Sequence, residues 1–130
     1  MSQLPMSPGP DRASPAKPVG PYTPMVRAGD WLIASGQLGL ADGALVDGGV
    51  PAQLNQAIAN LEALLEGSGA SLAAVAKVTV FLIDMADYTA MNDAYVAAFG
   101  EHRPARSALA VAGLPLGAAV EIEAWAWVGG

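Results

Sequence analysis

Apolar residues recur with a helical period in two segments of the chain. The first stripe ends at Gly67-Ser68-Gly69, and the second begins after Asp87, a good N-cap residue, and ends at Gly100. The stripes consist of Leu54, Ala57, Ile58, Leu61, Leu64 and Leu65 and of Tyr88, Met91, Tyr95, Ala98 and Phe99. This spacing predicts two amphipathic helices, with Gln53 and Asn60 expected on other faces of the first helix.

Five further segments have the composition or the two-residue period of β-strands. They are a weaker strand near Thr23–Arg27 and the segments Trp31–Gly36, Lys77–Ile83, Ser107–Ala112 and Val120–Val128. Lys77–Ile83 is rich in β-branched and aromatic residues, so we expect it to be mostly buried on both sides. The order β-β-α-β-α-β-β predicts an α+β fold with both helices on one face of a mixed sheet.

The last predicted strand alternates cleanly between two faces. Its small and apolar residues Ile122, Ala124, Ala126 and Val128 point one way, which suits packing under the helices. Glu121, Glu123, Trp125 and Trp127 point the other way. Two tryptophans on an open sheet face are better explained by a partner subunit that covers them than by exposure to water.

The overall composition also favours a protein with covered apolar faces. Hydrophobic residues make up 53% of the 130 residues and charged residues 14%, against about a quarter charged in ordinary globular domains. A membrane protein is the competing explanation. The longest uncharged run near the C-terminus, Ala108–Val120, contains Pro115 and is too short for a spanning helix of about 20 residues. We therefore expect an oligomer and no membrane span.

The N-terminal segment differs in composition from the rest of the chain. Residues 1–18 are rich in proline and lack the apolar core of a secretory signal. We expect a flexible arm there, a single domain over residues 19–130, and a cytoplasmic location by default.

Charge and missing residue types exclude several functional classes. The net charge of −6 argues against a nucleic-acid-binding face, which is basic. The chain has no cysteine and one histidine, His102, so cysteine and histidine metal sites and thiolate catalysis are excluded. Phosphate-cradling glycine motifs and the nucleophile elbow are missing too.

Arg106 and Glu121 are the residues most suggestive of chemistry. Arg106 follows Pro104 at a strand entrance, and its forked guanidinium suits a small carboxylate. Glu121, beside indole rings, would be partly desolvated, which suits a general acid/base. Two simpler interpretations remain open: Arg106 in an intersubunit salt bridge, and Glu121 with Glu123 on an edge strand kept soluble by charge.

Four other residues are weaker candidates for a ligand site. Ser35 could donate a hydrogen bond to a carboxylate, and Gly36 would let a ligand approach the backbone. Equally, the pair could simply end a strand. Tyr22 could pack a turn and Asn92 could be an ordinary exposed helix residue. His102 is expected to be a solvated loop histidine.

Several of these segments together resemble the Rid family (reactive intermediate deaminases, also called the YjgF or RidA family). The resemblance covers the chain from about Pro18 to its end and depends on the joint order of its pieces. They are VGPY at Val19–Tyr22, IASGQL at Ile33–Leu38, the Gln53–Gly69 helix, VAKVTVFLIDMADYTAMNDAY at Val75–Tyr95, PARSALAVAGLP at Pro104–Pro115 and VEIEAWA at Val120–Ala126.

The resemblance implies a chorismate-mutase-like homotrimer with a central barrel and three ligand sites between subunits. It also implies hydrolysis of 2-enamines and 2-imines, such as 2-iminobutanoate and 2-iminopropanoate, to 2-keto acids and ammonia without a metal or organic cofactor. Arg106 matches the family's carboxylate-binding arginine and Glu121 its water-positioning acid. Residues that would line the cleft are Tyr22, Ser35, Gly36, Asn92 and, through its backbone, Ala108.

The chain departs from the family pattern in two places. Ala108 stands where the family often has a cysteine, and the loop Gly100–Arg103 is short, with no aromatic residue before Pro104. The short loop puts the preference for a substrate side chain in doubt, whereas Ala108 changes little if the family uses that position through its backbone. Two alternatives to a deaminase are a trimer that binds small keto acids without turnover and the endoribonuclease or translation inhibitor activity attached to the family. The acidic charge and single histidine argue against the latter.

Overall fold

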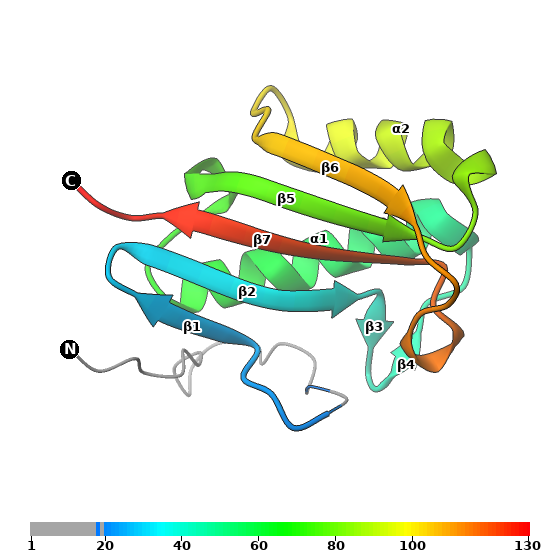
Figure 1. Cartoon of the computed structure of the whole chain (residues 1–130), viewed down its shortest axis with the longest axis horizontal. Coiled ribbons are helices and arrows are strands. Elements are labelled where there is room, and N and C mark those ends of the chain that lie inside the picture. The colour runs from blue at the N-terminus through cyan, green and yellow to red at the C-terminus, as the bar shows by residue number, and fades with distance from the viewer. Residues whose placement is uncertain (1–17, 19) are drawn as a thin grey trace.

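The computed structural model, which describes residue 18 and residues 20–130, is built around a five-stranded mixed sheet (Figure 1). Its strands are β1 (Met25–Ala28), β2 (Trp31–Leu38), β5 (Val75–Leu82), β6 (Ala105–Ala110) and β7 (Val120–Trp127), in the order β1-β2-β7-β5-β6. The helices are α1 (Gly49–Gly67) and α2 (Tyr88–Phe99). The predicted α+β layout is confirmed; the predicted arm lies outside the described residues, apart from Pro18.

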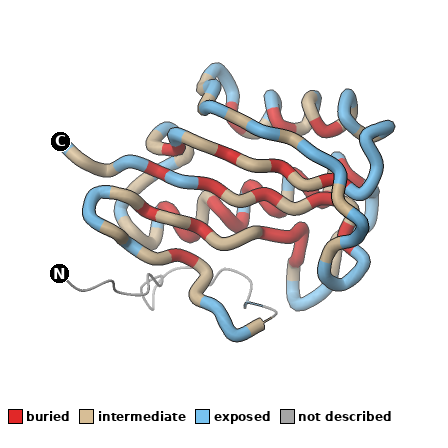
Figure 2. The backbone as a smooth tube through the Cα atoms, viewed as in Figure 1, coloured by how far each residue is buried: buried red, intermediate tan, exposed pale blue. Residues whose placement is uncertain are grey.

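Both helices cover one face of the sheet, as the apolar stripes predict (Figure 1). The core between them combines one side of the strands with the inner faces of the helices, and Figure 2 shows these buried segments in red. Residues with almost no exposed surface include Leu32, Val78, Val80, Ile122, Leu54 and Leu61. No helix in the described part of the chain is long and apolar enough to cross a bilayer.

Strand β7 lies in the middle of the sheet, between β2 and β5, and pairs antiparallel with both. The edge-strand interpretation of Glu121 and Glu123 is therefore wrong. The edge nearest α2 is instead β6, which runs parallel to β5 with Val78 opposite Arg106. A parallel neighbour requires a crossover, and the chain makes it through α2.

A small hairpin that the pattern did not predict follows β2. Strands β3 (Leu40–Ala41) and β4 (Ala44–Leu45) are joined by Asp42 and Gly43, which both have positive φ. The two-residue turn itself agrees with the Asp-Gly turn signal in the sequence. Three short 3-10 turns, η1 (Leu72–Ala74), η2 (Met85–Asp87) and η3 (Pro115–Gly117), complete the described elements.

Two polar residues of α1 are buried, contrary to the expectation that they lie on other faces. Asn60 donates from its amide nitrogen to the carbonyls of Leu38 and Leu40, both at 3.0 Å. The side-chain oxygen of Gln53 accepts from the backbone N–H of Ala119 at 2.9 Å. These bonds replace the water that both amides lose on burial, and they hold the end of β2 and the start of β7 against the helix.

The face of the sheet away from the helices keeps much of its apolar surface exposed. Trp125 and Trp127 are 42% and 46% exposed, which confirms the alternation predicted for the last strand. Trp31 lies between them, with ring centroids 5.8 and 5.0 Å away. In β5, Val78, Val80 and Leu82 are buried while Phe81 and Thr79 are half-buried, so burial on both sides is wrong for one chain.

Candidate active site

Arg106 lies on the helix-facing side of β6, because its register partner Val78 is a core residue. Its guanidinium packs against α2: Nη2 donates to the Tyr88 hydroxyl at 3.1 Å, and the guanidinium carbon lies 4.8 Å from the centre of the Tyr95 ring. Within the described residues Arg106 has no carboxylate partner, since Arg27–Asp30 is the single ion pair there. An intersubunit salt bridge, the simpler interpretation of Arg106, involves a second chain and stays a prediction.

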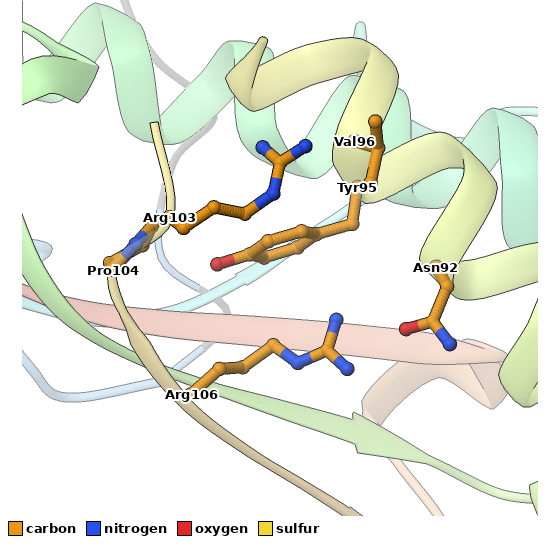
Figure 3. Close-up of a pocket in the computed structure, with 6 residues that line it drawn as sticks. All are labelled: Asn92, Tyr95, Val96, Arg103, Pro104 and Arg106. Carbon is orange, nitrogen blue, oxygen red and sulfur yellow. The ribbon is translucent and has the colours of Figure 1, made fainter. Parts of the chain in front are cut away.

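A cavity of about 290 Å³ opens beside this guanidinium. Figure 3 shows the residues that line it, which are Asn92, Tyr95, Val96, Arg103, Pro104 and Arg106. The Asn92 side-chain oxygen and the Tyr95 hydroxyl are buried and find no hydrogen-bond partner among the described residues. Burial raises the pKa of Tyr95, and the nearby Arg106 and Arg103 oppose that rise. Unsatisfied buried polar atoms beside a cavity are typical of a ligand site.

Ser35 and Gly36 occupy a β-bulge in β2. The register passes from Ala34 opposite Ala124 to Gln37 opposite Ile122, so Ser35 and Gly36 together oppose one residue of β7. The Ser35 hydroxyl donates to the Thr23 carbonyl at 2.7 Å. Its single proton is thus used inside the chain, and donation to a ligand would require the hydroxyl to rotate.

Glu121 lies directly over Gly36. A Cβ placed on Gly36 would come within 2.7 Å of the Glu121 carboxyl carbon, so the absence of a side chain at Gly36 makes room for the carboxylate. Burial, and secondarily the neighbouring Glu123, raise the pKa of the Glu121 carboxyl above its ordinary value of 4.5. A raised pKa brings a carboxyl closer to the range in which it can both accept and donate a proton near neutral pH.

The positions of Tyr22 and Ala108 give less support for a role in a ligand site. Tyr22 is 42% exposed and its backbone N–H donates to the Gly20 carbonyl at 2.9 Å, in a bend before β1. Ala108 follows Arg106 on the same face of β6 and packs against the core.

The candidates separate into two groups on opposite faces of the sheet. Arg106, with Asn92 and the cavity, is on the helix side, whereas Glu121 pairs with Phe81 on the open side. Phe81 also pairs with Leu109, so Arg106 and Glu121 are two strands and three residues apart, roughly 14 Å between Cα atoms. Within one chain, the Glu121 carboxylate therefore does not lie beside the arginine.

Sequence reasoning missed three residues of the arginine group. Tyr88, Met91 and Tyr95 were assigned to the apolar stripe of α2, yet all three contact the Arg106 guanidinium. Their i, i+3, i+7 spacing identified one face of α2, but the sequence did not show that Arg106 of β6 packs against that face. His102 was expected to be solvated; it is half-buried, and its Nε2 donates to the Val75 carbonyl at 2.7 Å.

Comparisons with known proteins agree on one family. The family model described as Endoribonuclease L-PSP matches residues 12–128. A RutC family protein of Pyrococcus horikoshii is 43% identical over 113 residues, covering 85% of this chain and 90% of that protein. The 2-iminobutanoate/2-iminopropanoate deaminase of Capra hircus is 44% identical over 108 residues, covering 82% and 79%.

Solved structures show the same fold. The YjgF gene product of E. coli superimposes with a TM-score of 0.80 at 37% identity, covering 85% of this chain and 90% of that one. The two helices on one face of a mixed five-stranded sheet are therefore those of a YjgF-like fold. With a matching family model over most of its length and relatives above 40% identity, the chain belongs to the Rid family of YjgF and L-PSP proteins.

Proposed function

We propose that this protein is an imine deaminase that hydrolyses small 2-imino acids, of the 2-iminobutanoate and 2-iminopropanoate type, to 2-keto acids and ammonia. The observation that carries the proposal is Arg106: a half-buried guanidinium with no carboxylate partner among the described residues, beside a cavity of about 290 Å³. Such a group is suited to bind the carboxylate that every 2-imino acid carries. Relatives named as imine deaminases support the reaction.

The proposed site combines two copies of the chain. Arg106 and Glu121 of one copy lie on opposite faces of the sheet, too far apart for one small substrate to touch both. The exposed tryptophans of the open face favour a second copy packed there. A cyclic trimer would place the Glu121 side of one subunit against the Arg106 side of the next, giving three equivalent sites.

The chemistry requires positioning and one proton shuttle. Arg106 would hold the substrate carboxylate and so orient the C=N bond toward a water molecule. As the water oxygen bonds to the imine carbon, Glu121 of the neighbouring copy would take its proton and pass it to the nitrogen. Glu121 would then carry the hydroxyl proton of the resulting carbinolamine to its amino nitrogen; the C–N bond breaks, ammonia leaves, and the oxygen forms the keto C=O bond. An enamine would first tautomerise to the imine.

The groups around Arg106 fit this role. Tyr88 and Tyr95 hold the guanidinium by a hydrogen bond and by ring contact, which reduces the freedom lost when a ligand binds.

Gly36 leaves space for the Glu121 carboxylate, and the raised pKa of Glu121 suits an acid/base near neutral pH. Because an imine reacts with water unaided, modest acceleration is enough. We propose the cytoplasm as the place of action.

The test is hydrolysis of an imine made in situ by a threonine or serine dehydratase. The wild-type protein should release 2-keto acid faster than the uncatalysed reaction. Arg106→Leu should remove that gain and Arg106→Lys should keep a small part, because lysine keeps the charge and loses the fork. Arg27→Leu, which removes a surface arginine paired with Asp30 at 3.8 Å, is the matched control. A wild-type protein that leaves the rate unchanged over several imines would favour keto-acid binding without turnover.

A further inference from the structure

The cavity beside Arg106 contains a second arginine. Arg103 and Arg106 both line it, and Figure 3 shows their guanidinium groups on opposite sides of the Tyr95 ring. Arg103 donates from Nη1 to the backbone carbonyls of Gly100 and His102, which anchors its guanidinium in the short loop before Pro104. Two guanidinium groups therefore line one small cavity, one from the start of β6 and one from the loop just before it.

The charge of this cavity is unusual for the molecule. The protein has a net charge of −6, yet none of the six lining residues is acidic. Over residues 18 and 20–130 neither Arg103 nor Arg106 has a carboxylate within salt-bridge distance. Two like charges on one partly enclosed cavity repel each other and attract anions, and a ligand with two negative groups relieves both effects.

We propose that the preferred substrate is an imino diacid, an imine with a second carboxylate on its side chain, and that Arg103 binds that carboxylate. This inference rests on the proposed deaminase function and defines its substrate class. Arg106 takes the α-carboxylate, and Arg103 selects the side chain. A cavity of about 290 Å³ suits a small diacid rather than a large ligand.

The two unsatisfied atoms of the cavity fit the same ligand. The Tyr95 ring lies between the two guanidinium groups, and its buried hydroxyl, at the end of the ring near Pro104, can donate to a carboxylate oxygen. The Asn92 side-chain oxygen can accept from the N–H of the imine, and so distinguishes the nitrogen end from the carboxylates. Each atom that has no partner in the described chain thus gains one from a single imino diacid.

The experiment compares the full-length protein on two imines that an amino-acid oxidase makes in situ, one from alanine and one from glutamate. The wild type should have the higher kcat/KM for the glutamate-derived imine. Arg103→Leu should lower the ratio of the two kcat/KM values by about 10- to 100-fold, the loss expected for one charge-assisted contact. Arg103→Lys should recover part of the ratio. Arg27→Leu, with the same change of net charge, should leave the ratio unaltered.

The outcomes separate this inference from the proposed function. Equal rates on both imines, with a ratio that Arg103→Leu does not change, would overturn the diacid preference and leave the deaminase intact. Acceleration of neither imine would overturn the deaminase. In that case calorimetric titration with 2-oxoglutarate and 2-oxobutanoate decides: tighter, Arg103-dependent binding of the diacid supports the second carboxylate site, and equal binding overturns it.

Discussion

At the scale of single residues, the Glu121 carboxylate occupies the space above Gly36. Gly36→Ala would place a methyl group 2.7 Å from the carboxyl carbon and 3.0 Å from the neighbouring methylene. Because the obstructed group is the end of a flexible side chain, the carboxylate should turn aside while the sheet stays intact. We expect kcat/KM to fall on the order of 100-fold, as for other misplaced catalytic groups, with a stability loss below about 1 kcal/mol.

Gly113→Ala is the matched control for that substitution. No atom lies within 4 Å of a Cβ placed on Gly113, and its φ is outside the left-handed region. Activity and melting temperature should therefore both stay near the wild-type values. Wild-type activity in Gly36→Ala, measured by the same imine assay, would show that the position of Glu121 over Gly36 has no catalytic role.

The raised pKa of Glu121 predicts two pH dependences. As a base, Glu121 must be ionised, so kcat/KM should fall as pH drops through a pKa above 4.5, and Glu121→Gln should remove that limb along with most activity. A pH–rate profile of both proteins tests this. An acid limb that persists unchanged in Glu121→Gln would assign the titration to another group.

The raised pKa of Glu121 also makes folded stability depend on pH. Activity is expected to rise with pH, whereas folded stability is expected to fall. A carboxyl whose pKa is higher in the folded state binds its proton more tightly there, so folded stability falls as pH rises above 4.5 through the folded pKa. Glu121→Gln should therefore melt at a higher temperature than the wild type above that window, and the difference should vanish below pH 4.5. Thermal unfolding at a series of pH values measures it.

At the scale of elements, Asn60 connects α1 to the junction of β2 and β3. Asn60→Ala would leave the buried carbonyls of Leu38 and Leu40 without their donor, and we expect a loss of about 2–4 kcal/mol of unfolding free energy. Gln56→Ala is the control, because Gln56 donates to the Asn60 oxygen at 2.9 Å and should cost about 1 kcal/mol or less. Equal losses in urea denaturation would contradict this role for Asn60.

The element scale also shows what could be predicted from sequence. The apolar stripe of α1 and the alternation of β7 report which side of an element is buried, and both predictions are confirmed. The burial of Asn60 could not be predicted, because it depends on contacts with the carbonyls of Leu38 and Leu40, about 20 positions earlier in the chain.

Some residues of the candidate site were predictable from the sequence, but their arrangement was not. Arg106 follows from its motif, but the face it occupies is set by the parallel pairing with β5, which local periodicity does not report. Glu121 lies on the opposite face of the sheet, which the sequence alone did not indicate. Arg103 was recorded as a departure in the loop before Pro104, and only the cavity relates it to Arg106.

At the scale of the whole molecule, the open sheet face predicts self-association. Trp125, Trp127 and Leu109 are each more than 40% exposed on that face, and large apolar side chains exposed on one sheet face are characteristic of subunit contacts. Sedimentation should give a mass three times the 13.1 kDa of one chain. Trp125→Glu should lower the measured mass toward that of the monomer and should also abolish activity. A wild-type protein that is monomeric and active would contradict a shared site.

The most direct test of the central claim mixes two inactive proteins. Arg106→Leu keeps an intact Glu121, and Glu121→Gln keeps an intact Arg106. If each site takes Arg106 from one subunit and Glu121 from the next, every mixed trimer contains one complete site. Unfolding the two variants together in equal amounts and refolding them should then restore about a quarter of the wild-type imine hydrolysis rate, since about three quarters of random trimers are mixed. Mixed trimers that form and remain as inactive as either parent would contradict the account.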